Sequence, residues 1–110
     1  MEARRILVAN ELTSYRQTIA IVFRELHPGV EVREVDPTIL DGELVRLDPD
    51  LVICSRATAT VRARAANWIE LYPECKSFST FCIGGEHRAM EDVQLSDLLS
   101  VCARVLWRAP

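Results

Sequence analysis

The sequence predicts an α/β protein, a three-layer α/β/α sandwich around a mostly parallel, five-stranded sheet. Short runs of branched apolar residues, typical of buried strands, alternate along the chain with longer segments whose apolar residues recur at helical spacing. Such alternation calls for parallel strands joined by right-handed crossovers, with helices on both faces. The chain has 110 residues, of which 49% are hydrophobic. We therefore expect one domain over residues 1–110 with a substantial core.

The N-terminal part of the chain predicts a strand followed by a helix. Residues 4–10, "RRILVAN", contain a short run of branched apolar residues, as a buried strand does. The helix begins near Ser14, because Gln17 follows at the spacing of a capping box. Pro28 cannot continue a helix and Gly29 tolerates a left-handed exit, so the helix ends just before them.

The next segment predicts a second strand, a second helix and the central strand. Residues 30–35 alternate between apolar and polar side chains, as a strand near a sheet edge does. Asp36 followed by Pro37 is typical of a helix start. One face of that helix carries Leu40, Leu44 and Leu47. Residues 50–55, "DLVICS", predict a third strand that is buried and ends at Ser55.

The C-terminal half predicts a third helix, two strands and a last helix. Thr58 or Thr60 can cap the third helix. Its buried face would carry Val61, Ala65, Trp68 and Ile69. Residues 76–85 predict a fourth strand that two glycines stop, and only a short fifth strand, around 88–91, fits before a helix capped by Ser96. Between the last two strands there is no room for a helix.

Composition and cysteine spacing exclude several classes of protein. The net charge is -3 and the charges are interspersed, so there is no basic face for a nucleic acid. The apolar run near the N-terminus is too short for a signal sequence or a membrane span, so we expect a cytoplasmic protein without membrane contact. The four cysteines show no metal-ligand spacing. They are Cys54, Cys75, Cys82 and Cys102. We expect no metal and no cofactor.

Three stretches carry a family resemblance. "RILVANELTSYRQTIAIVFRELHPGVEV" has the order of a strand, a helix and a strand, "LDPDLVICS" leads to a third strand end, and "HRAMEDVQLSDLLSVCARVL" closes with a strand and a helix. In order and spacing they resemble the receiver domains of bacterial two-component response regulators. The resemblance implies a flavodoxin-like fold with strand order 2-1-3-4-5. The helix that receivers place between strands four and five is missing here.

The resemblance also indicates where a functional site would lie. Receivers bind magnesium through an acidic pair after the first strand, which falls on Asn10 and Glu11. They phosphorylate an aspartate after the third strand, which falls on Ser55, and read the phosphate with a Ser/Thr and a lysine, which fall on Gly84 and Glu91. Only Glu11 keeps the required chemical type. A serine hydroxyl needs a neighbouring base, and one carboxylate is a poor magnesium site. We expect a degenerate site with no catalytic residue and no aspartyl phosphorylation.

By this resemblance the chain is a non-enzymatic signalling or regulatory module that acts through protein–protein interaction. Loss of the fourth crossover helix should leave strands four and five less covered, and uncovered apolar surface usually marks an interface. We expect a protein partner or a homodimer that contacts strands four and five and the last helix. Trp107 is a further candidate for that interface.

A second hypothesis is a small anion- or nucleotide-binding domain. Arg56, Thr58, Thr60 and Gly85 could form an anion pocket at a helix N-terminus, although arginines on a solvent-facing helix are more often solubilising. The IIB components of sugar phosphotransferase systems are similar in length but carry a cysteine after the first strand, where this chain has "ANELTS". A hydrolase that uses Ser55 lacks the G-x-S-x-G motif.

Overall fold

A computed structural model describes residues 4–106. Trp107 lies outside the described residues. The strands are β1 (Arg5–Ala9), β2 (Glu31–Glu34), β3 (Leu51–Cys54), β4 (Trp68–Glu70), β5 (Phe78–Ile83) and β6 (Glu86–Glu91). The helices are α1 (Thr13–Leu26), α2 (Leu40–Leu47), α3 (Ala59–Arg64) and α4 (Leu95–Leu106), with short 3-10 turns at Pro37–Ile39 and Pro73–Cys75.

The strands form one six-stranded mixed sheet in the order β2-β1-β3-β4-β5-β6. The strands β2, β1, β3 and β4 are parallel to one another, whereas β5 is antiparallel to β4 and β6 is antiparallel to β5. The predicted five-stranded, mostly parallel sheet is therefore wrong in the number of strands and in the direction of the fourth. A parallel crossover needs a dozen or more residues, and residues 71–77 between β4 and β5 are too few.

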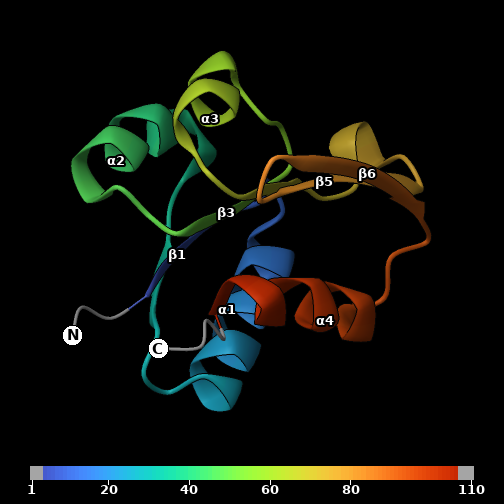
Figure 1. The fold of residues 1–110 in the computed structure, drawn as a ribbon, viewed down its shortest axis with the longest axis horizontal. Coiled ribbons are helices and arrows are strands. Elements are labelled where there is room, and N and C mark those ends of the chain that lie inside the picture. The colour runs from blue at the N-terminus through green and yellow to red at the C-terminus, as the bar shows by residue number, and fades with distance from the viewer. Residues whose placement is uncertain (1–3, 107–110) are drawn as a thin grey trace.

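Helices cover both faces of the sheet, as the predicted three-layer α/β arrangement requires. Figure 1 shows α1 and α4 on one side of the strands and α2 and α3 on the other. Side chains of β1 alternate between the two faces of the sheet, so the core has two parts. Ile6 and Val8 pack towards α1 and α4. Leu7 and Ala9 pack towards α2 and α3. Among the described residues, no helix has the length and apolar character needed to cross a membrane.

Trp68 and Ile69 belong to β4, although the spacing predicts them on the buried face of the third helix. Helix α3 already ends at Arg64. Trp68 packs in the core under α2 and α3, and Ile69 packs in the core under α1 and α4. Two adjacent side chains that point to opposite faces define a strand, so the prediction of a helix through Ile69 is wrong.

The helix starts are partly as predicted. Asp36 accepts a hydrogen bond from the N–H of Thr38 at 2.9 Å, and Thr58 Oγ1 accepts one from the N–H of Val61 at 3.1 Å. Both predicted caps are confirmed, and Leu40, Leu44 and Leu47 are buried as expected. Ser14 and Ser96 are not caps, because each lies inside the first turn of its helix.

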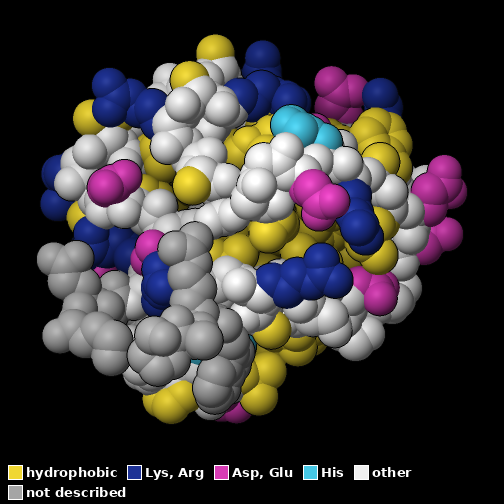
Figure 2. Space-filling view, in the orientation of Figure 1, with side chains coloured by type: hydrophobic (Ala, Val, Ile, Leu, Met, Phe, Trp, Pro, Cys, Tyr) yellow, Lys and Arg dark blue, Asp and Glu magenta, His cyan; other side chains and the backbone are white. Residues whose placement is uncertain are grey.

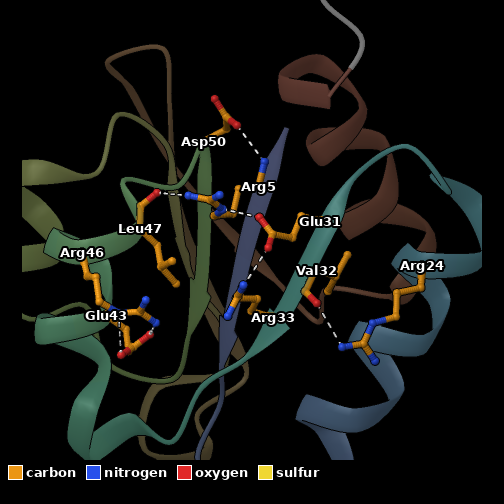
Figure 3. A network of polar contacts seen from close by, with 9 residues as sticks. All are labelled: Arg5, Arg24, Glu31, Val32, Arg33, Glu43, Arg46, Leu47 and Asp50. Carbon is orange, nitrogen blue, oxygen red and sulfur yellow. Dashed lines mark hydrogen bonds and ion pairs between the residues drawn. The ribbon is translucent and has the colours of Figure 1, made fainter. Parts of the chain in front are cut away.

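Hydrogen bonds and ion pairs connect neighbouring segments at the edge of the sheet where β1 and β3 begin (Figure 3). Asp50 accepts a hydrogen bond from the backbone N–H of Arg5 at 2.8 Å, and the Arg5 guanidinium donates to Glu31 and to the carbonyl oxygen of Leu47. Glu31 also pairs with Arg33 at 2.9 Å. The hydrogen bonds from Arg5 and then from Arg33 lower the pKa of the Glu31 carboxyl. We call this edge the amino edge, and the opposite one, where the parallel strands end, the carboxyl edge.

Candidate functional site

Two loops meet at the carboxyl edge. Asn10 and Glu11 follow β1, Ser55 and Arg56 follow β3, and these two strands are neighbours in the sheet. The backbone N–H of Glu11 donates a hydrogen bond to Ser55 Oγ at 2.9 Å. The structure thus brings Asn10, Glu11 and Ser55 together, as strand ends at the same edge of a parallel sheet require.

Asn10 is the most deeply buried member of this cluster. Only 1% of its surface is exposed, and its Oδ1 has no hydrogen-bond partner among the described residues. Its backbone carbonyl oxygen accepts a hydrogen bond from Arg16 Nη1 at 3.0 Å, which ties α1 to the end of β1. An unpaired buried amide oxygen costs free energy, and such groups are few in folded proteins.

Ser55 has no base beside it among the described residues. Its Oγ accepts the backbone N–H of Glu11, and among the described residues no side chain makes a hydrogen bond with it. The side chain of Glu11 is exposed. A serine hydroxyl at its ordinary pKa needs a base within hydrogen-bond reach. The cluster therefore has no activated nucleophile among the described side chains.

A hollow of about 320 Å³ beside Ser55 includes Arg56 and Thr58 in its lining. The Thr58 hydroxyl is already engaged, because it accepts the N–H of Val61 and donates to Asp41 Oδ1 at 2.6 Å. Thr60 lies in the first turn of α3, outside this lining. Arg56 is exposed and makes no ion pair with any described residue. With Glu11 also in the lining, the hollow has mixed charge and is a weak anion site.

Gly84 and Gly85 lie at the amino edge and not beside Ser55. They form the turn between β5 and β6, and β5 runs antiparallel to β4, which carries its end away from the cluster. The N–H of Gly84 donates to Asn67 Oδ1 at 2.9 Å, and Asn67 Nδ2 donates to the carbonyl oxygen of Asp50 at 2.9 Å. Asn67 is buried, and its role was not predicted from the sequence.

Glu91 lies at the carboxyl edge but far from Ser55. It ends β6, and the strands β4 and β5 separate β6 from β3. At about 4.8 Å per strand this places the two backbones roughly 14 Å apart. Glu91 therefore does not contact the Asn10, Glu11 and Ser55 cluster.

His87 belongs to the other end of the sheet as well. It pairs with Cys82 in the register of β5 and β6, its Nε2 lies 3.6 Å from Cys82 Sγ, and its ring stands edge-on to Trp68 at 5.9 Å between centroids. Ser55 follows the carboxyl end of β3. A catalytic pair of Ser55 and His87 is thus excluded by the topology.

Sequence reasoning missed a second hollow, of about 270 Å³, on the other side of Ser55. Lys76, the only lysine in the sequence, lies in its lining with Glu11 and Ser55. The Lys76 ammonium pairs with Glu74 at 3.6 Å. Tyr72 lies at the same place, where desolvation raises the pKa of its hydroxyl. The signal that could have found this hollow is the reversal of the chain after β4, which brings residues 72–77 back to the carboxyl edge.

Two buried thiols are unsuited to chemistry. Burial, and then the negative charge of Glu70, raise the pKa of Cys54 to about 12. Burial also raises the pKa of Cys102 far above the usual range for a thiol. Cys75 is exposed, and all four cysteines are free. Cys54, Cys82 and Cys102 are buried in the core of the protein.

Among residues 4–106, no group of three or more His, Cys, Asp or Glu side chains is placed to hold a metal ion. In comparisons with known proteins, no family model matches the chain, and neither a curated protein nor a solved structure gives a significant match. Arguments about function therefore rest on the residues themselves.

Proposed function

We propose that this chain is a receiver-like signalling or regulatory module that binds proteins and is not phosphorylated on aspartate. One observation carries the proposal. Asn10 and Ser55 lie together at the carboxyl edge, in the positions where a receiver has carboxylates, and the Ser55 hydroxyl accepts a backbone hydrogen bond from Glu11. A receiver site that had lost its phosphorylated aspartate would have this arrangement, which supports the proposal.

The arrangement of strands supports the receiver-like part of the proposal. The order β2-β1-β3-β4 of the parallel strands is the order of the first four strands of a receiver. The β5 and β6 hairpin then takes the place of the fourth crossover helix and the fifth strand. On this proposal Lys76 and Arg56, which line the two hollows beside Ser55, are the cations near the position that a phosphate would take, and Glu91 is not involved.

The surface formed by β5, β6 and α4 supports the protein-binding part. A groove of about 230 Å³ between the hairpin and the helix has an apolar floor that includes Phe81, Ile83 and Met90. Arg88 and Asp97 are among its charged lining residues. Figure 2 shows acidic and basic side chains interspersed over β6 and α4 with apolar side chains between them. An apolar groove with charged residues beside it is typical of a protein interface.

Phosphodonor treatment tests the proposal directly. The protein is incubated with acetyl phosphate and Mg²⁺, and its intact mass is measured, with Ser55→Ala as the matched control. We expect no phosphoryl adduct on either protein, because neither offers a carboxylate at the end of β3. Any phosphoryl adduct on the wild-type chain, acid-stable or acid-labile, would overturn the proposal, and its loss in Ser55→Ala would place it on Ser55.

A thermal-shift screen tests the anion-binding alternative. Inorganic phosphate, nucleotides and cyclic dinucleotides are compared on the wild type and on Arg56→Ala. Ligand binding to the folded state raises the melting temperature by mass action. A large shift that Arg56→Ala removes would favour the anion-binding domain, whereas the protein-binding module predicts none.

A further inference from the structure

We propose that β6 pairs antiparallel with β6 of a second copy of this chain, so that the two sheets continue across a two-fold axis at Ala89. The proposal rests on the proposed function only in that it names one partner of a protein-binding module.

The two outermost strands of the sheet, β2 and β6, differ in how well their outer sides are covered. β2, at one edge, has four residues, and its residues 31 and 35 donate their N–H groups inward to β1. Val32 therefore points its carbonyl oxygen outward, where Arg24 Nη2 donates a hydrogen bond to it at 3.0 Å. Figure 3 shows Arg24 reaching that edge from α1. This contact covers β2, as proteins commonly do with sheet edges.

β6, at the other edge, is longer and uncovered. It has six residues, five of them exposed. The N–H of Asp92 donates to the carbonyl oxygen of Ser77 at 2.8 Å, so the even-numbered residues of this strand face β5. His87, Ala89 and Glu91 therefore direct their N–H and C=O groups away from the sheet. Within residues 4–106 no hydrogen bond reaches these groups.

Residues that face outward alternate along β6, and this restricts the registers in which β6 of a second copy can pair with it. Only outward-facing residues of one copy can exchange hydrogen bonds with outward-facing residues of the other. Two registers give the greatest overlap under that rule. One places Ala89 opposite Ala89 of the second copy, and the other places Arg88 opposite Arg88 of the second copy.

The charges select the register centred on Ala89. In it, His87 lies opposite Glu91 of the second copy, and this pair occurs twice because of the symmetry. Arg88 lies opposite Met90 of the second copy, so the two Arg88 side chains are diagonal neighbours and do not face each other directly. The other register sets two arginines directly against each other, which is destabilising.

Disulfide trapping tests the register. Cys75→Ser removes the exposed thiol, and Ala89→Cys or Arg88→Cys is then added. In the proposed register the two Ala89 Cα atoms would be about 5.5 Å apart, within the range of a disulfide, whereas the two Arg88 positions would be diagonal and roughly 7–8 Å apart. We expect Ala89→Cys to form a covalent dimer under mild oxidation much faster than Arg88→Cys. Equal or reversed rates would overturn the proposed register.

The oligomeric state tests the pairing itself. Light scattering after size exclusion should show a dimer for the wild type and a monomer for Ala89→Pro at the same concentration. Proline removes an outward N–H that β5 does not use, so circular dichroism should stay unchanged. Glu91→Arg should weaken the dimer at least about tenfold, and His87→Glu with Glu91→Arg should restore it.

A monomeric wild type at high concentration would overturn the dimer and leave the proposed function standing, because a different protein could still bind the groove. A phosphoryl adduct on Ser55 would overturn the proposed function and leave the dimer standing.

Discussion

Asn10 and Asn67 are both buried amides with opposite surroundings. Asn67 accepts from the N–H of Gly84 and donates to the carbonyl oxygen of Asp50, so it joins β5 to the start of β3. Asn10 Oδ1 has no described partner. Removing a paired buried amide leaves its partners unpaired, whereas removing an unpaired one relieves a cost.

These amides should therefore respond differently to replacement by leucine, whose side chain has the same number and branching of heavy atoms as that of asparagine. Asn10→Leu should raise the free energy of unfolding by about 1 kcal/mol, and Asn67→Leu should lower it by roughly 1–3 kcal/mol. Chemical denaturation of both variants measures the difference. If Asn10→Leu destabilised the protein as much as Asn67→Leu, the Asn10 amide would have a partner in solution.

The thiols should differ in reactivity by their burial. Cys75 is exposed, whereas burial raises the pKa of Cys54 to about 12 and so suppresses its thiolate. Under native conditions a disulfide reagent should modify Cys75 rapidly and leave Cys54 and Cys102 unmodified. Cys75→Ser should abolish the fast phase. Rapid modification of Cys54 in that variant would contradict the buried position of β3.

Among the elements, the hairpin of β5 and β6 makes one side of the sheet antiparallel. Gly84 and Gly85 form its two-residue turn with φ of 59° and 85°. Both glycines can adopt the left-handed region without the cost of a side chain, and two such residues are typical of a type I′ hairpin turn. The double glycine is therefore a sequence signal for a hairpin, and not only for the end of a strand.

Substitution of the turn tests this hairpin. Gly85→Ala should cost about 1–2 kcal/mol of stability, since its φ is left-handed. Gly29→Ala is the matched control, because Gly29 has open space around it and no left-handed φ. We expect that control to be neutral or slightly stabilising in thermal unfolding. Equal melting temperatures for both variants would show that the turn is not formed as described.

At the scale of the whole molecule, the sequence predicts the parallel half much better than the antiparallel half. The runs at Ile6 and Leu51 are continuous and apolar, so their strands and their common edge with Asn10 and Ser55 could be placed. β4 has three residues and too little pattern to compete with the helical spacing of Val61, Ala65 and Trp68. Strand direction depends on the length of the connection, which no local periodicity shows.

The ion pairs at the amino edge should make the free energy of unfolding depend on pH in the acid range. Arg5 and Arg33 lower the pKa of Glu31 in the folded state below 4.5, its value without such partners. The stabilisation is therefore complete above the unfolded pKa and is lost as the pH falls through the folded pKa. Glu31→Gln should make the free energy of unfolding less dependent on pH in this acid range. An unchanged pH dependence would show that the pairs of Figure 3 contribute nothing in solution.

If the carboxyl edge is a receiver-like site without phosphoryl chemistry, as we propose, it should not respond to a phosphoryl mimic. The most direct measurement is a titration with Mg²⁺ and beryllofluoride, a phosphoryl mimic, followed through the backbone amide signals by NMR. We expect the signals of Glu11, Ser55 and Arg56 to stay unchanged at saturating concentrations. Saturable shifts centred on these residues would contradict the account.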